Sequence, residues 1–116
     1  MSPTELTLKM LRSDGWTAQV VERWNPHAKV RQDLFGFIDI VAFKPSEGVL
    51  GVQATSYANI SARKNKILNS AKAKDWIQCA GLYVIGWRKK ARLPGGRELW
   101  EPTLYPFSIS DWENEH

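Results

Sequence analysis

The sequence contains almost no cysteine and no long hydrophobic run. Cys79 is the single cysteine among 116 residues, which excludes an internal disulfide and a zinc site built from several cysteines. No apolar stretch approaches the roughly 20 residues that span a membrane, and the first residues lack the basic segment and apolar core of a secretory signal. We therefore expect one intracellular domain, residues 1–116, without a membrane partner.

Acidic residues are scarce in the middle of the chain. Residues 57–97 contain ten Lys or Arg and one acid, Asp75, whereas residues 1–56 contain six of each sign and residues 98–116 contain five acids and no Lys or Arg. This concentration of positive charge favours a polyanionic partner, with nucleic acid first. The alternative is a solvated helix face followed by a charged turn. The acidic end, residues 111–116, is expected to be flexible.

Hydrophobic periodicity and turn residues predict a mixed α/β order. A helix is expected over residues 3–14, and a helical region that breaks near Asn69 and Ser70 is expected between Asn59 and Gly81. The expected strands cover residues 16–24, 34–43, 49–55, 82–87 and 99–107. Within the second of them, Gly36 indicates a point where another group approaches the backbone closely. The fold class predicted is a central mixed β-sheet flanked by helices.

Asp39 is the residue whose environment most needs an explanation. It lies between Ile38 and Ile40 on a strand that should be buried, where an unpaired carboxylate is costly or takes up a proton. A metal ion or a cationic side chain would stabilise it. The strand alone does not decide between these two partners. The cationic side chain would be that of Arg31, in an ion pair with Asp39.

The next strand adds polar groups that favour the metal. Gln53 and Thr55 lie two residues apart and so share a face of the sheet. Their neutral oxygens suit Mg²⁺, which proteins usually hold with one or two carboxylates and waters. Glu5, in the first helix, could supply a second carboxylate. Its alternative role is that of a first-turn glutamate favoured by the helix dipole.

In combination, these residues resemble the PD-(D/E)XK nuclease superfamily. That family has a glutamate in an N-terminal helix, an arginine and a glycine before an aspartate on a strand, an acidic or amide residue on the next strand, and a basic helix. The layout is similar to archaeal Holliday junction resolvases and to small phage-encoded relatives, over roughly residues 3–80. The matching residues are Glu5, Arg31, Gly36, Asp39 and Gln53-Ala54-Thr55.

The resemblance implies a restriction endonuclease-like core and a metal-dependent endonuclease that hydrolyses DNA, including branched or junction DNA. It implies Mg²⁺ or Mn²⁺ as cofactor, the cytoplasm of a bacterium or phage-infected cell as location, and a homodimer as an arrangement suited to a two-fold symmetric junction. The metal ligands it implies are Asp39, Glu5, Gln53 and the backbone carbonyl of Ala54.

Thr55 departs from the family pattern, because the family has a lysine there and threonine carries no positive charge. Basic residues on the following helix could reach back instead, with phosphate contact without chemistry as their alternative role. The catalytic set is therefore Glu5, Asp39, Gln53, Thr55 and Lys66. The residues expected to contact nucleic acid are Arg31, Arg63, Lys64, Lys66, Arg88, Lys89 and Lys90.

Two other functions are compatible with the sequence. One is a nuclease-fold protein that binds nucleic acid without cutting it, and the other is an interaction module that dimerises through the strands within residues 82–107.

The tryptophans are expected in different environments. Trp16, Trp24 and Trp76 are expected in the core, whereas Trp87 either stacks on a base or packs at a strand end.

Overall fold

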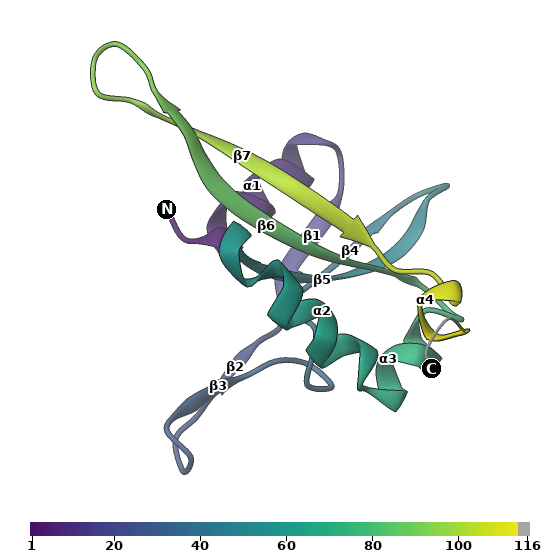
Figure 1. The fold of residues 1–116 in the computed structure, drawn as a ribbon. Coiled ribbons are helices and arrows are strands. Elements are labelled where there is room, and N and C mark those ends of the chain that lie inside the picture. Colours follow the sequence, from purple (N-terminus) through teal and green to yellow (C-terminus); the bar gives the residue numbers. More distant parts are fainter. Residues whose placement is uncertain (114–116) are drawn as a thin grey trace.

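A computed structural model describes residues 1–113 as a five-stranded mixed sheet with helices on both faces (Figure 1). The sheet has the order β1-β4-β5-β6-β7, in which β5 and β6 are parallel and the other neighbours are antiparallel. Its strands are β1 (Thr17–Val20), β4 (Ile40–Lys44), β5 (Gly48–Ser56), β6 (Gly81–Arg92) and β7 (Glu98–Pro106). This architecture confirms the predicted class, a mixed sheet flanked by helices.

The remaining elements lie around this sheet. Two short strands, β2 (Arg23–Asn25) and β3 (Val30–Gln32), form a separate hairpin that projects from the body (Figure 1). The helices are α1 (Pro3–Ser13), α2 (Ile60–Leu68), α3 (Ala71–Trp76) and α4 (Ser110–Glu113), with a 3₁₀ turn, η1 (Tyr57–Asn59), before α2. The acidic end that was expected to be flexible thus begins in α4, and residues 114–116 lie outside the described residues.

Apolar side chains fill both faces of the sheet. The helix α1 covers one face, and α2 and α3 cover the other (Figure 1). The core under α1 contains Leu6, Leu11, Ala18, Ile40, Ala42, Leu50, Val52, Ile85 and Trp87. The core under α2 and α3 contains Phe37, Ile38, Ile67, Ala73, Leu82, Val84, Phe107 and Trp112.

Local sequence explains where α1 begins and how it is held. Ser2 caps the helix by accepting a hydrogen bond from the backbone of Glu5, and Pro3 occupies the first turn, where its missing N–H costs nothing. The buried hydroxyl of Thr7 accepts a hydrogen bond of 2.9 Å from the indole of Trp87. Trp87 is therefore a packing residue, and its base-stacking alternative is excluded.

Close contact at one glycine fixes α2 against the sheet. Gly86 of β6 lies so near Ile60 that a Cβ at this position would overlap the isoleucine side chain. The glycine thereby sets the distance at which α2 crosses β6, and with it the position of Lys66 two turns further along the helix. None of the helices described in residues 1–113 is long and apolar enough to cross a membrane.

Two expected strands differ from the structure. The strand expected over 16–24 is divided into β1 and β2, with Val21 and Glu22 between them. The strand expected over 34–43 is shorter, because Leu34 to Ile38 form a turn closed by a 2.8 Å bond from the Leu34 N–H to the Ile38 carbonyl. At the other end of the chain, β6 extends into the basic segment, and β7 lies at the sheet edge as expected.

Candidate metal centre

Asp39 lies at the point where β4 begins, and its backbone is fixed from both sides. Its N–H donates to the Val52 carbonyl at 2.9 Å, and its carbonyl accepts from the Val21 N–H at 2.8 Å. Because the pairing of β4 with β5 starts at Ile40, the N–H of Ala54 has no strand partner there and donates to Oδ2 of Asp39 at 2.9 Å. The hydrogen bond from Ala54 therefore holds the Asp39 carboxyl group in a fixed direction. Asp39 is only 5 % exposed.

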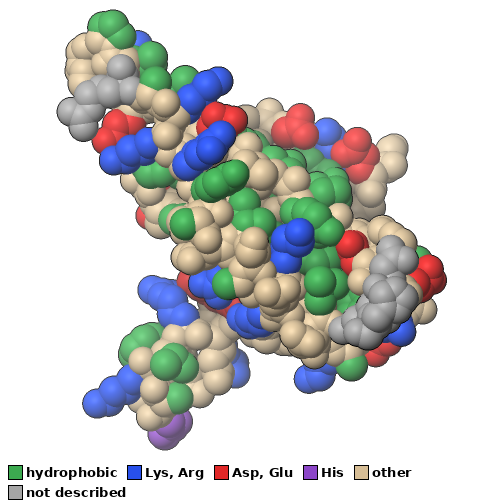
Figure 2. Space-filling view, in the orientation of Figure 1, with side chains coloured by type: hydrophobic (Ala, Val, Ile, Leu, Met, Phe, Trp, Pro, Cys, Tyr) green, Lys and Arg blue, Asp and Glu red, His purple; other side chains and the backbone are tan. Residues whose placement is uncertain are grey.

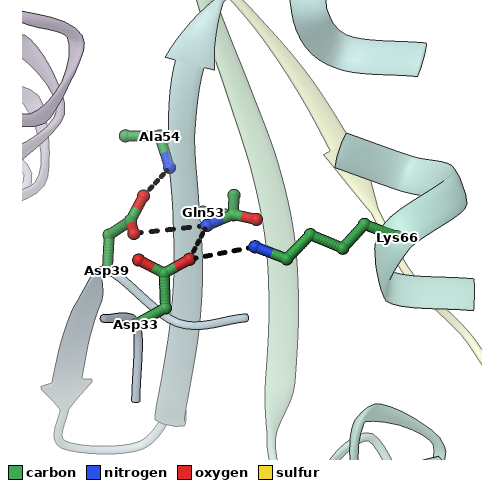
Figure 3. Close-up of polar contacts among 5 residues, drawn as sticks. All are labelled: Asp33, Asp39, Gln53, Ala54 and Lys66. Atoms are coloured by element: carbon green, nitrogen blue, oxygen red, sulfur yellow. Dashed lines mark hydrogen bonds and ion pairs between the residues drawn. The ribbon is translucent and has the colours of Figure 1, made fainter. Parts of the chain in front are cut away.

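The turn before Asp39 brings a second carboxylate beside it. The N–H of Gly36 donates to the Asp33 carbonyl at 3.0 Å, and Gly36 has a φ of 86°, which favours glycine. No atom lies within 4 Å of a Cβ built at Gly36, so its role is this left-handed backbone and not the close approach expected from the sequence. The turn reverses the chain, so that Asp33 and Asp39 face each other (Figure 3).

Gln53 connects the two carboxylates. Its Nε2 donates to Oδ2 of Asp33 at 2.8 Å and to Oδ1 of Asp39 at 3.2 Å (Figure 3). The side chain is only 1 % exposed, and its Oε1 has no hydrogen-bond partner among the described residues. The two ends of an amide are nearly the same shape, so a half-turn of this group would direct the oxygen at the carboxylates. Gln53 could therefore add an oxygen ligand to a cation placed between them.

A third carboxylate completes the cluster. Ligand oxygens of Glu22, Asp33 and Asp39 all lie within 4.8 Å of one another. An octahedral Mg²⁺ with ligands at about 2.1 Å separates neighbouring ligand atoms by about 3.0 Å and opposite ones by about 4.2 Å. The acids, within 4.8 Å of one another, are close enough to reach one such ion after small side-chain movements, and an amide oxygen such as that of Gln53 is a suitable further ligand.

The environment shifts the pKa values of the two aspartates in opposite directions. Burial, with a hydrogen bond that the protonated Asp39 carboxyl donates to Asp33, raises the pKa of Asp39 from 3.8 to about 7. Burial acts in the same direction on Asp33, but its hydrogen bonds with Asp39 and Gln53 and the positive charge of Lys66 outweigh it and lower its pKa. Near neutral pH the pair can therefore share one proton. A divalent cation would replace that proton, because it stabilises both carboxylates in the charged form.

Positive side chains line the same pocket as the acids. Lys66 of α2 extends to the cluster, with Nζ 3.3 Å from Oδ2 of Asp33 (Figure 3). Arg31 of β3 lies 3.5 Å from Glu22. Figure 2 shows Lys and Arg side chains gathered where the β2–β3 hairpin meets the body, with acidic groups between them. The pocket measures about 260 Å³ and is lined by Thr4, Glu22, Arg31, Asp33, Asp39, Gln53, Ala54, Arg63 and Lys66.

The structure brings together six of the residues expected at the site and places Glu5 elsewhere. Those in the pocket are Arg31, Asp39, Gln53, Ala54, Arg63 and Lys66. Glu5 instead lines a separate depression with Met1 and Lys9, because successive residues of a helix point about 100° apart and Thr4 is the one that faces the pocket. The structure therefore does not bring Glu5 into the pocket, and the third carboxylate there is that of Glu22.

Thr55 and Lys64 also lie outside the pocket lining. Thr55 shares a face with Gln53, but it is buried and about 6.6 Å further along β5. Lys64 does not line the pocket, and its Nζ lies 3.8 Å from the centre of the Tyr105 ring. A role in catalysis for Thr55 and a role in phosphate binding at this pocket for Lys64 are not supported by these positions.

The basic residues of β6 lie on the long β6–β7 hairpin, and two of them have acidic partners there. Arg88 lies 3.9 Å from Glu101, and Lys89 lies 2.9 Å from Glu98. Lys90 is exposed. The cross-strand acids reduce the net positive charge of this hairpin, so the charge run seen in the sequence overstates the cationic surface available to a polyanion.

Sequence reasoning missed Glu22 and undervalued Asp33. Glu22 was assigned to the interior of a continuous strand, whereas it lies at the bend between β1 and β2. The sequence alone favours a turn residue or an ion-pair partner at Asp33 over a ligand. In the structure Asp33 is both, because its carbonyl accepts a hydrogen bond from Gly36 and its carboxylate forms an ion pair with Lys66. The available signal was Gly36, whose turn brings the two aspartates together although six positions separate them in the sequence.

Comparison of the chain with protein-family models finds no match, and comparisons with curated proteins and with solved structures find none either. The geometry of the pocket is therefore the basis on which function can be argued.

Proposed function

We propose that the protein is a metal-dependent nuclease of the PD-(D/E)XK type that hydrolyses DNA phosphodiester bonds at the pocket around Asp39. The observation that carries this proposal is the meeting of three carboxylates and three cationic side chains in one pocket of about 260 Å³. The Gln53 amide links two of these carboxylates, and its oxygen has no hydrogen-bond partner among the described residues.

The charges in the pocket suit a metal ion and a phosphate together. The acids are Glu22, Asp33 and Asp39, and the cations that balance them are Arg31, Arg63 and Lys66. A divalent cation bound to the acids would lower the pKa of a bound water and would stabilise negative charge on the phosphate. With that ion the pocket has an excess of positive charge, which favours the entry of a phosphodiester.

The surrounding side chains have separate roles in this proposal. Arg31 and Arg63 bind the phosphate oxygens, because a guanidinium group donates two parallel hydrogen bonds to such a group. Lys66 takes the place of the family lysine that Thr55 does not supply, since its ammonium group already reaches Asp33. The backbone carbonyl of Ala54 lies on the same strand edge as its N–H, which contacts Asp39, so it is a further candidate ligand.

The arrangement of the sheet supports the same proposal. The acidic residues sit at the start of β4 and beside β5, in a sheet where β5 is antiparallel to β4 and parallel to β6 and helices lie on both faces. We propose a restriction endonuclease-like core on this basis. A homodimer and a bacterial or phage-infected cytoplasm stay predictions of the family resemblance.

Cleavage assays test the proposal directly. Purified protein is incubated with linear, flapped and four-way DNA in Mg²⁺ or Mn²⁺, and cleavage is expected with at least one substrate. It should disappear in Asp39→Ala and persist in Glu5→Ala, a matched loss of one carboxylate outside the pocket. If wild-type protein cuts none of these substrates with either metal, the proposal of an enzyme fails.

A second function is favoured by Gln53 and Thr55, which replace an acid and a lysine of the family pattern. In that case the chain is a nuclease-fold protein that binds DNA and does not cut it. Binding that weakens with salt, together with absent cleavage in both metals, would support this alternative.

A further inference from the structure

The β2–β3 hairpin leaves the body at the acid pocket. Glu22 directly precedes β2, Arg31 lies within β3 and Asp33 directly follows it, so both ends of the hairpin contribute to the pocket. The hairpin is not part of the five-stranded sheet, and it projects away from the body (Figure 1). The hairpin therefore borders the acid pocket.

Two large apolar side chains of the hairpin are exposed. Trp24 is 54 % exposed and Val30 is 47 % exposed, although Trp24 was expected in the core. An isolated two-stranded hairpin is only marginally stable in water, and an exposed indole adds nothing to its folding. A tryptophan in this position is better explained by contact with a partner than by packing.

The charge of the hairpin indicates what kind of partner it fits. Residues 23–32 contain Arg23, Lys29 and Arg31 and no acid. All three residues of β3 are exposed. A basic and aromatic hairpin is complementary to a polyanion that also offers flat apolar faces, which describes a nucleic acid strand.

The register of the hairpin places the tryptophan on the face that continues into the pocket. Trp24 is the direct cross-strand partner of Arg31, so their side chains lie next to each other on the same face. Arg31 lines the acid pocket and also a second depression of about 560 Å³, where Lys66, Lys72 and the exposed Phe35 lie. A cationic surface therefore runs from the indole past the acids.

We propose that Trp24 stacks on an unpaired base beside the phosphate held in the pocket, so that the substrate is DNA with a single-stranded segment. This inference rests on the proposed nuclease function and names its substrate class. In a blunt duplex the bases stack on each other and leave free only the outer faces of the two terminal pairs, whereas an overhang, flap or open junction offers unpaired bases. Base stacking on an aromatic ring tolerates any sequence, so the preference concerns DNA structure.

The test measures DNA binding by fluorescence anisotropy in EDTA, where no metal supports cleavage. Three labelled ligands are compared: single-stranded DNA, a blunt duplex, and a duplex with a single-stranded overhang. The variants are Trp24→Ala and Trp24→Phe. Phe43→Ala is the matched control, because Phe43 is an aromatic residue on β4 with a similar exposure of 52 %, four residues from Asp39 along the chain.

Trp24→Ala is expected to weaken binding of the single-stranded and overhang ligands about tenfold and to leave the blunt duplex within about twofold. Trp24→Phe should retain most of the affinity, and Phe43→Ala should match wild type. The salt dependence should be unchanged in Trp24→Ala, since no charge is removed, whereas Arg31→Ala should reduce its slope by about one. Circular dichroism verifies that each variant is folded.

A second measurement reports stacking itself. An overhang that contains 2-aminopurine should change its fluorescence on binding wild type and should not do so on binding Trp24→Ala. If Trp24→Ala weakens all three ligands equally, or none, the stacking proposal is wrong while the nuclease proposal stands. If wild type binds none of the three ligands in EDTA, the stacking proposal fails, and the cleavage assays in Mg²⁺ or Mn²⁺ decide the nuclease proposal separately.

Discussion

Asp39 should make the protein without metal less stable as the pH rises from 5 to 8. Its pKa is about 7 in the folded protein against 3.8 as the ordinary value, so between these values the folded state holds a proton that the unfolded chain has released. The contribution of Asp39 to the free energy of unfolding is therefore fully present below pH 3.8 and is lost as the pH rises through about 7. The lowered pKa of Asp33 acts in the opposite direction and below this window.

The size of the effect follows from the shift. Part of the shift of about three pKa units already acts at pH 5, and about two units remain between pH 5 and pH 8, which correspond to about 2.6 kcal/mol at 1.36 kcal/mol per unit as an upper limit. Water in the open pocket screens the charge, and halving the limit leaves about 1.3 kcal/mol. With a urea dependence of about 2 kcal/mol per molar for a small domain, the unfolding midpoint should fall by about 0.6 M between pH 5 and pH 8.

Urea unfolding in EDTA, followed by circular dichroism, measures this change. Asp39→Asn is the comparison, because the amide keeps the shape of the side chain and cannot ionise. We expect the variant to lose most of the pH dependence and to be at least as stable as wild type at pH 8. Equal midpoints for wild type at both pH values, or the same slope in Asp39→Asn, would refute the reasoning.

Three further predictions concern the side chains around the centre. Lys66→Ala should reduce cleavage by about 10²-fold or more in stopped cleavage assays. Its Mn²⁺ affinity, measured by calorimetry, should be equal or higher, because a positive charge beside the acids is lost. Glu22→Gln should weaken Mn²⁺ binding at least tenfold in calorimetry, whereas Glu5→Gln should leave it unchanged. Gly86→Ala should destabilise the fold by about 1–3 kcal/mol in urea unfolding through overlap with Ile60, and Ile60→Ala should relieve part of that loss in the double variant.

The fold class could be predicted because the apolar residues repeat with the periods of helices and strands. The helix at the N-terminus, the break before α3 and the edge strand β7 follow from capping residues, from Asn69 and Ser70, and from prolines. The shortening of the second predicted strand could not be seen, because Leu34 to Ile38 are apolar enough for a strand and turn only through backbone conformations that composition does not reveal.

The candidate site could be predicted only in part. Asp39 was identified because a buried acid is unusual wherever it occurs, and Gln53 because it places a neutral oxygen ligand on the next strand. Glu22 could not be identified, since its role depends on a bend that directs it across to β4. Glu5 and Thr4 are neighbours in the sequence, and which of them faces the pocket depends on the rotation of α1, which only tertiary packing sets.

The most direct test of the metal centre is a crystal soaked in Mn²⁺ and measured for anomalous scattering. We predict one peak between the carboxylates of Glu22, Asp33 and Asp39, at metal–oxygen distances of about 2.1–2.2 Å, with the amide oxygen of Gln53 turned toward it. The peak should be absent in Asp39→Ala crystals treated in the same way. No peak between these carboxylates in wild type, or a peak only in the depression beside Glu5, would contradict the account.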